Sequence, residues 1–323
     1  MNNADSAYFK FLQRIMRKVI GIGETVLDII FQGNQPVSAV PGGSVFNALI
    51  SLGRAGVYGT FISETGNDRV GNIITSFLEE NGVSAANVNI YPDSKSPISL
   101  AFLNDKHDTE YIFYKDHPRD RLTFELPQIE EDDIVILGSY YAVNPVIRAQ
   151  VTSLLEAARK VGAIIYYDVN YRSSHSSETI KLMSNILENF EYADIVRGSD
   201  EDFEVMFGLK DAEKVYRSQI SFYSRNFIYT RGDKPLELFG APNFRKQYPV
   251  DMVEAVSTIG AGDNFNAGIL FGILKQGITR QMIVDGLTEQ QWDAIIRYAQ
   301  LFSANCCKSI YNCVDKDFGA TLS

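Results

Sequence analysis

Apolar runs and amphipathic stretches alternate regularly through the second half of the chain. Apolar runs of strand length occur at residues 134–137, 163–168, 194–196 and 227–230, and helical patterns lie between them at 145–160, 178–189 and 201–207. Alternation of strands with helices is typical of a parallel sheet that is covered on both faces. We therefore expect an α/β protein with three layers, in which a mainly parallel central sheet lies between two layers of helices.

The first half of the chain begins with the same rhythm. Residues 18–23 predict a buried first strand, and residues 25–31 predict a second strand that contains Asp28. A charged residue in an apolar strand is rarely buried without a partner. Asp28 therefore either pairs with another side chain or faces a ligand. Beyond it, the pattern predicts helices over about 44–53 and 68–81, and strands over 58–63 and 88–91.

A separate small sheet is expected from the stretch that follows. Residues 98–103 and 109–114 are two β runs joined by polar residues 104–108, which is the pattern of a hairpin. Together with residues 29–40, this hairpin would project from the body as a lid. We divide the chain into an N-terminal extension at 1–17 and one domain at 18–323, with a β lid from about 29–40 and 88–118.

Polar clusters follow three of the predicted strands, at residues 168–172, 197–202 and 230–233. In open parallel sheets, ligands bind beyond the carboxyl ends of the strands. The three clusters come in succession and all precede the turn at 257–265. They therefore predict the rim of one active site.

The turn at 257–265 carries the most distinctive chemistry. Gly260, Ala261 and Gly262 precede Asp263, which opens an apolar helix. Glycines allow close backbone approach, and the first N–H groups of a helix lack internal partners, so such a turn can hold a phosphate or an oxyanion. Asp263 would then be placed to accept a proton from an attacking hydroxyl. The alternative is that Asp263 only caps the helix, a position that Asp favours.

A second glycine turn lies near the N-terminus. Pro41, Gly42 and Gly43 end an extended segment, and Asn47 falls in the first turn of the helix that follows. The Asn47 amide is placed to hydrogen-bond a hydroxylated ligand that lies over the glycines. The alternative is a plain connection from strand to helix.

Charge and cysteine content narrow the class of protein. The 323-residue chain has a formal net charge of −10, which argues against binding to nucleic acid or to an anionic membrane. Binding of phosphates would then need local positive potential from backbone amides, a few basic side chains and a metal ion. Cys306, Cys307 and Cys313 match no zinc or redox motif, so we expect reduced, mostly buried thiols in a cytoplasmic protein.

The two glycine turns resemble the signatures of the ribokinase-like (pfkB) family of carbohydrate kinases. One signature is Pro41-Gly42-Gly43 with Asn47, and the other is Thr258-x-Gly260-Ala261-Gly262-Asp263. The similarity extends from about residue 18 to 310. It implies a ribokinase-like fold and an ATP- and Mg²⁺-dependent sugar kinase, most like the fructokinases. A 2-keto-3-deoxygluconate kinase, a ribose kinase and a non-catalytic sugar sensor remain the alternatives.

The resemblance implies a role for each matching residue. Asp263 would be the general base, and Gly260, Ala261 and Gly262 would form the anion hole for the transferred phosphoryl group. Residues implied to bind the sugar are Asp28, Gly42, Gly43, Asn47, Phe113, Lys115 and Arg172. Residues implied to bind the nucleotide are Asn170, Ser199, Thr230, Gly232 and Asn305, and Asp202 would contact Mg²⁺ through water.

Three positions depart from the family pattern. Ser257 stands where Asp is usual, which weakens the expectation of a monovalent-cation site nearby. Ser199 and Asp202 replace the usual Asn and Glu, and Asp202 is one methylene shorter. Lys115 replaces the Arg of relatives that act on 2-keto-3-deoxygluconate, and Lys cannot grip a carboxylate with two parallel bonds. We therefore favour a neutral sugar, fructose first. Pairing of lid edges into a homodimer is a further expectation.

Overall fold

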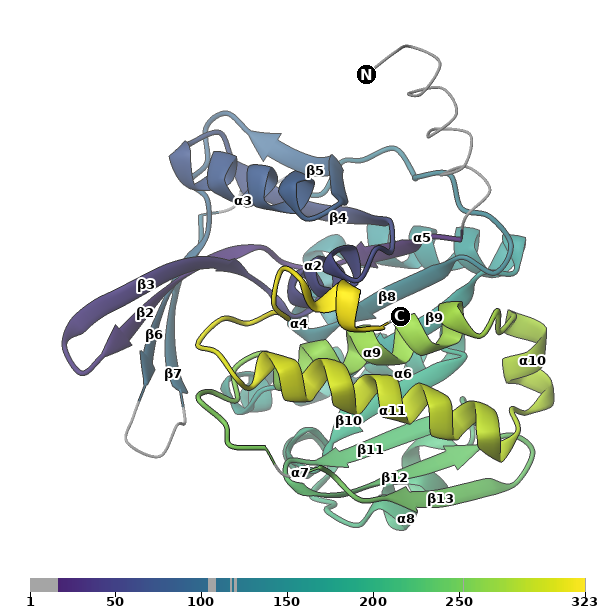
Figure 1. Ribbon diagram of the computed structural model, residues 1–323. Helices are drawn as coiled ribbons and strands as arrows, with labels where there is room; N and C mark the ends of the chain where they lie inside the picture. The colour runs from purple at the N-terminus through teal and green to yellow at the C-terminus, as the bar shows by residue number, and fades with distance from the viewer. Residues whose placement is uncertain (1–16, 104–108, 117, 119–120, 252, 323) are drawn as a thin grey trace, which may run out of the picture.

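The computed structural model describes residues 17–322 except 104–108, 117, 119–120 and 252. Within these residues two sheets form, a large central sheet and a small one that projects from it (Figure 1). The strand order of the central sheet is β13-β12-β11-β10-β9-β8-β1-β4-β5. These strands are β1 (Val19–Ile22), β4 (Gly59–Gly66), β5 (Val83–Tyr91), β8 (Ile134–Gly138), β9 (Ile164–Asp168), β10 (Ile195–Ser199), β11 (Phe227–Arg231), β12 (Lys234–Gly240) and β13 (Phe244–Tyr248).

The central sheet is mainly parallel, as expected from the alternation of strands and helices. Its strands from β5 to β11 pair in parallel, whereas β12 pairs antiparallel with both β11 and β13. The last two strands were not predicted. They form a hairpin without an intervening helix and extend the sheet at one edge.

Helices cover both faces of the central sheet and form two hydrophobic cores. One core packs under α2 (Ser44–Arg54), α3 (Arg69–Glu80), α9 (Ala261–Lys275), α10 (Arg280–Asp285) and α11 (Glu289–Cys306). The other packs under α4 (Ser139–Val143), α5 (Arg148–Val161), α6 (Thr179–Tyr192), α7 (Asp200–Phe207) and α8 (Ala212–Val215). The three-layer prediction is confirmed, and Cys306, Cys307 and Cys313 are free, buried thiols.

The small sheet, which we call the lid, has the order β3-β2-β6-β7 and extends away from the body in Figure 1. It consists of β2 (Val26–Gln32), β3 (Gln35–Gly42), β6 (Ile98–Leu103) and β7 (Thr109–Tyr114). Residues 88–91 were assigned to the lid from sequence, but they belong to β5 and pair with β4 in the central sheet. The predicted connection at 104–108 and the extension at 1–16 lie outside the described residues.

Register divides the lid residues between two faces. Asp28 lies opposite Ser99, which lies opposite Phe113, so these side chains share one face. Ile30, Ala101 and Tyr111 line the same face, and the cavity beneath it contains Asp28 and Tyr111. The lid therefore turns this face toward the body.

Helix α9 carries the Gly-Ala-Gly-Asp turn at its N-terminus and is held by close packing on α11. Ten of its fifteen residues are buried, which is the pattern of a helix surrounded by other elements. A Cβ at Gly268 would lie 2.7 Å from the Ala299 backbone nitrogen and closer still to other α11 atoms. The glycine therefore permits the two helices to approach each other.

We expect Gly268→Ala to destabilise the protein by about 1–3 kcal/mol, because overpacking outweighs the better helix propensity of Ala. Chemical denaturation followed by circular dichroism measures this change. Lys275→Ala, at the exposed end of the same helix, is the control and should leave the midpoint nearly unchanged. A Gly268→Ala protein as stable as the wild type would contradict the packing argument.

Candidate active site

The turn before α9 places Asp263 in the first helical turn without using it as a cap. The N-cap is Gly260, whose φ of 77° lies in the left-handed region that favours glycine. Asp263 comes three residues later, and its Oδ2 accepts a hydrogen bond of 2.8 Å from Asn47 Nδ2. The capping alternative is therefore wrong. Asn47 and Asp263 are 216 residues apart, and their bond joins the starts of the two helices that follow the glycine turns.

Burial raises the pKa of Asp263 to about 6, and the negative charge of Asp168 acts in the same direction. Hydrogen bonds from Asn47 and Ser44 and the charge of Arg172 oppose this rise. At neutral pH the carboxyl is therefore ionised and yet basic enough to accept a proton. A general base works best with a pKa near the working pH.

Asp28 lies on the lid beside the second glycine turn. Its carboxylate accepts a hydrogen bond from Ser99 Oγ, and burial raises its pKa to about 6. A Cβ at Gly42 would collide with this carboxylate, and one at Gly43 would collide with the Glu24 carbonyl. Both positions therefore need glycine. A small cavity here is lined by Asp28, Ile30, Val40, Ala101, Tyr111, Ile259, Ile310 and Asn312.

The basic side chains near this cavity are balanced by acidic ones. Lys115 Nζ lies 2.5 Å from Glu24 Oε2. Burial alone would raise the pKa of Glu24, but the ion pair with Lys115 outweighs this effect, and the pKa lies below its usual value. Arg172 stacks over the Tyr111 ring at 5.0 Å. Phe113 lies on the lid face that carries Asp28, and its side chain is 41% exposed.

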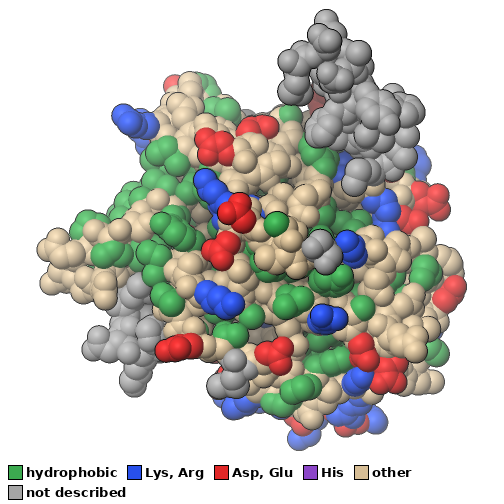
Figure 2. All heavy atoms as spheres, in the orientation of Figure 1, with side chains coloured by type: hydrophobic (Ala, Val, Ile, Leu, Met, Phe, Trp, Pro, Cys, Tyr) green, Lys and Arg blue, Asp and Glu red, His purple; other side chains and the backbone are tan. Residues whose placement is uncertain are grey.

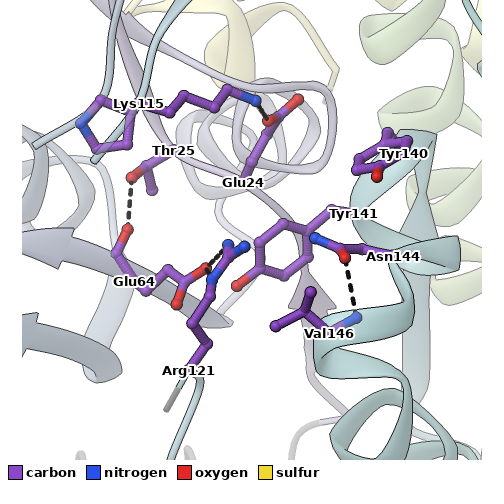
Figure 3. A pocket seen from close by; sticks show the side chains of 10 residues that line it. Glu24, Thr25, Glu64, Lys115, Arg121, Tyr140, Tyr141, Asn144 and Val146 are labelled. Carbon is purple, nitrogen blue, oxygen red and sulfur yellow. Dashed lines mark hydrogen bonds and ion pairs between the residues drawn. The ribbon is translucent and has the colours of Figure 1, made fainter. Parts of the chain in front are cut away.

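An adjacent cavity of about 240 Å³ continues from Glu24 and Lys115 toward α4 (Figure 3). In Figure 3, Arg121 lies against Glu64, and the Tyr141 ring faces them from α4. Tyr140 and Asn144 complete the far wall. The charged side chains that line this cavity are paired with one another, Lys115 with Glu24 and Arg121 with Glu64.

A larger cavity, of about 480 Å³, lies on the other side of the Gly-Ala-Gly-Asp turn. Ala261 and Gly262 of the turn line it, together with the predicted residues Ser199, Thr230 and Gly232. Its other lining residues include Arg197, Asp200, Glu201, Arg231, Asp233, Val250, Val253, Ala255, Gln300, Ser303, Ala304 and Cys307. The volume is in the range of small-molecule sites. The turn before α9 therefore lies between two cavities: Ile259 lines the small cavity under the lid, which we call the lid cavity, and Ala261 and Gly262 line the larger one.

Three predicted residues do not line this larger cavity. Asp202 is buried, and its two oxygens accept hydrogen bonds from the Tyr171 and Ser199 backbone N–H groups and from the Ser199 hydroxyl. Asn305 Nδ2 donates a hydrogen bond to the Asp315 carboxylate, and Asn305 Oδ1 accepts one from the Asp315 backbone N–H. Asn170 follows β9 in the left-handed region, with φ of 37°. Asp200 and Glu201 of α7 line the cavity in place of Asp202.

Two site residues were not assigned a role from sequence. Arg197 lies under the turn on β10, and its Nη1 is 2.9 Å from Asp168 Oδ1. Sequence analysis placed Arg197 in the polar cluster at 197–202 but gave it no role of its own. Asn312 packs against Gly42 and Gly260, and its carbonyl accepts a 2.9 Å hydrogen bond from Asn264. No local pattern marks Asn312.

A glycine turn that opens a helix, with a carboxyl in the first helical turn and a cavity on each side, is an arrangement that suits phosphoryl transfer. Among known proteins, a family profile described as "pfkB family carbohydrate kinase" matches residues 16–313. The protein thus uses a sugar hydroxyl as acceptor. The chain belongs to the pfkB family of carbohydrate kinases and has the ribokinase-like fold.

Individual relatives support the same class. The chain is 27% identical over 271 residues to "Probable fructokinase-4" of Arabidopsis thaliana, covering 79% of this chain and 82% of that protein. It is 28% identical over 248 residues to the "5-dehydro-2-deoxygluconokinase" of Geobacillus thermodenitrificans, covering 72% of each. The structure of Vibrio cholerae fructokinase, bound to fructose, ADP and calcium, superposes with a TM-score of 0.81 at 19% identity, covering 95% of this chain and 99% of that one. Among the described residues, no helix is long and apolar enough to cross a membrane.

We expect Asp263→Asn to raise the melting temperature at pH 8, with a gain that shrinks toward pH 4. The folded-state pKa of about 6 exceeds the ordinary value of about 4, so the folded protein loses stability as this carboxyl ionises between those pH values. Replacing the carboxylate removes that loss at high pH and changes little at low pH. Thermal unfolding across this pH range measures the effect, and Asp285→Asn at an exposed position is the control. A lower melting temperature at pH 8 would contradict the assigned burial penalty.

Proposed function

We propose that this protein transfers the γ-phosphoryl group of Mg-ATP to a hydroxyl of a neutral sugar, fructose first. The observation that carries the proposal is the position of Asp263. It directly follows a glycine turn that would bind an anion, and this turn has the lid cavity on one side and the larger cavity on the other. In-line phosphoryl transfer needs this placement of acceptor, base and nucleotide more than it needs covalent chemistry.

The sugar would bind under the lid. Asp28, Asn47 and Arg172 would offer hydrogen-bond partners for its hydroxyls. Gly42 lets the backbone lie directly against the Asp28 carboxylate. Asp263 would take the proton from the attacking hydroxyl. The lid would exclude water from this reaction, which strengthens the electrostatic interactions within the site.

The γ-phosphoryl group would bind at the N-terminus of α9. The first N–H groups of a helix have no acceptor within the helix, and the helix dipole adds partial positive charge there. Gly260, Ala261 and Gly262 let a phosphate approach these groups closely. One missing transition-state donor in such a site typically costs about 10²–10³-fold in rate.

The rest of ATP would occupy the larger cavity, against Ser199, Thr230 and Gly232. Mg²⁺ prefers oxygen ligands and keeps several waters, and the Asp200 and Glu201 carboxylates at the cavity wall fit this preference. When bound, Mg²⁺ would neutralise phosphate charge. Asn170 near the phosphates, a monovalent cation near Ser257, and a cytoplasmic location stay predictions.

The choice of a neutral sugar rests on the ion pair of Lys115. This ammonium is bound to Glu24 and is not free to pair with a substrate carboxylate. A kinase for an acidic sugar, such as 2-keto-3-deoxygluconate, is the second candidate, because one relative is named as a deoxygluconokinase. A ribose kinase and a non-catalytic sensor on the same fold are the remaining alternatives.

We expect one neutral sugar to drive ADP release from Mg-ATP, and Asp263→Asn to lose about 10²–10⁴-fold in kcat while still binding that sugar. The panel comprises fructose, tagatose, ribose, adenosine and 2-keto-3-deoxygluconate. Asp285→Asn, an exposed carboxylate on α10, is the matched control. Turnover only with 2-keto-3-deoxygluconate would favour the second candidate. Sugar binding by calorimetry without any turnover would favour the sensor.

We also propose that the lid pairs with a second copy of the chain. Ile112 and Tyr114 lie on the outer face of β7 and are 42% and 55% exposed, and β3 and β7 are edge strands. Figure 2 shows hydrophobic side chains gathered toward the lid side of this view, where charged side chains are sparse. Exposed apolar edges of this kind mark interaction sites.

Sedimentation velocity should therefore show a dimer for the wild type and a monomer for Ile112→Glu, because a buried, unpaired carboxylate opposes association. Ile180→Glu is the matched control, since Ile180 is 93% exposed on α6 in the helical layer. A wild type that stays monomeric at micromolar concentration would refute pairing through the lid.

A further inference from the structure

Three polar side chains form a row across the sheet directly under the N-terminus of α9. Arg197 on β10 is the register partner of Asp168 on β9 and of Ile228 on β11, and Thr230 lies two residues beyond Ile228. Side chains two residues apart on a strand share a face. Asp168, Arg197 and Thr230 therefore occupy the same face as the apolar residues beneath α9, but at the carboxyl edge, where ligands bind.

The Arg197 guanidinium is held rigidly in this row. Its Nη1 lies 2.9 Å from Asp168 Oδ1, and its Nη2 donates a 2.8 Å hydrogen bond to Thr230 Oγ1. Only 8% of the residue is exposed, yet it lines the larger cavity. Its Nε is buried and has no hydrogen-bond partner among the described residues. A buried donor left unpaired in a native structure calls for a functional or structural reason.

The same guanidinium packs against the turn. A Cβ at Gly262 would lie 3.3 Å from Nη2 and 3.4 Å from Nη1 of Arg197. The positive charge therefore sits immediately beneath the backbone that would bind the transferred phosphoryl group. Of the described residues that line the cavity, Arg197 and Arg231 are cationic, and Arg231 is bound to Pro235 and Glu237 at the β11–β12 turn.

The surrounding charge favours a cation at this position. Asp168 and Asp202 are buried carboxyls nearby, and the pKa of Arg197 lies above its usual value despite the cost of burial, mainly through Asp168. The guanidinium thus stays protonated. A charge fixed in place before the reaction stabilises developing negative charge without reorganisation.

We propose that Arg197 is a positioning residue for phosphoryl transfer, which holds the Gly260–Gly262 turn from below and supplies its fixed positive charge. The inference rests on the proposed kinase function. It differs from a purely structural role, in which Arg197 would serve only to neutralise Asp168.

Three variants separate these roles. Arg197→Met removes the charge at similar side-chain length. Arg197→Lys keeps the charge but cannot reproduce the paired contacts of the guanidinium with Asp168 and Thr230. Asp168→Asn combined with Arg197→Met removes both members of the pair, which proteins tolerate better than one buried charge left alone. Arg280→Met is the control, since Arg280 pairs with the buried Asp194, which directly precedes β10, outside both cavities.

We expect Arg197→Met to lower kcat by about 10²–10³-fold, with the KM for the sugar within about twofold of the wild type. The kcat of Arg197→Lys should be at least about tenfold higher than that of Arg197→Met, and the double variant should be as slow as Arg197→Met. Calorimetry adds a second readout. Mg-ADP with aluminium fluoride and sugar mimics the transferring phosphoryl group, and Arg197→Met should weaken its binding about 100-fold. The affinity for Mg-ADP alone should change less than about threefold. Arg280→Met should lower the melting temperature and leave kcat unchanged.

Recovery of kcat in the double variant would overturn the inference, because Arg197 would then only neutralise Asp168. If Arg197→Met weakened the binding of Mg-ADP as much as that of the aluminium fluoride complex, the inference would also be overturned, because Arg197 would then only help to bind the nucleotide. If Arg197→Met does not fold, the double variant and Arg197→Lys carry the test. If no sugar supports turnover by the wild type, the proposed function itself fails, whereas turnover by Arg197→Met at the wild-type rate sinks this inference alone.

Discussion

The ion pair between Arg197 and Asp168 is the interaction on which the candidate site depends. Removing two charges from water is costly, and the attraction repays this cost only when further hydrogen bonds complete the geometry. Here Asp168 Oδ2 accepts a hydrogen bond from Asn266 on α9, whose side-chain oxygen in turn accepts one from Tyr166. The pair therefore joins the sheet to the helix that carries Asp263, and the position of this carboxyl is set by buried electrostatics as much as by hydrophobic packing.

The apolar surroundings of α9 make this arrangement effective. The helix is buried along most of its length, and the close approach permitted by Gly268 keeps α11 against it. Water is thereby excluded from the region beneath the Gly260–Gly262 turn, and the charges there act in a medium of low dielectric constant. Burial also raises the pKa of Asp263, which lies in the first turn of this helix. One packing arrangement thus sets both the surroundings of the turn and the basicity of the carboxyl beside it.

Sequence reasoning was most successful where periodicity and short-range turn chemistry decide the structure. The alternation after residue 134 predicted the parallel sheet, and the hairpin pattern predicted β6 and β7. It missed β13, which is mostly polar and half-exposed at the sheet edge, and β12, whose buried apolar residues are only Leu236, Leu238 and Phe239. Asp202 and Asn305 were assigned by resemblance, but their side chains are used in local hydrogen bonds that spacing does not reveal. Arg197 and Asn312 act through partners far along the chain, which a local pattern cannot indicate.

The position of Asn312 bears on how the protein is made in the cell. This residue lies between the N-terminal glycine turn and the turn before α9, where its amide donates to the Pro41 carbonyl and its own carbonyl accepts from Asn264. During synthesis Pro41 leaves the ribosome long before Asn312, which is 271 residues further along the chain. The nascent chain therefore lacks one wall of the lid cavity, and the link between the two turns, until Asn312 has emerged.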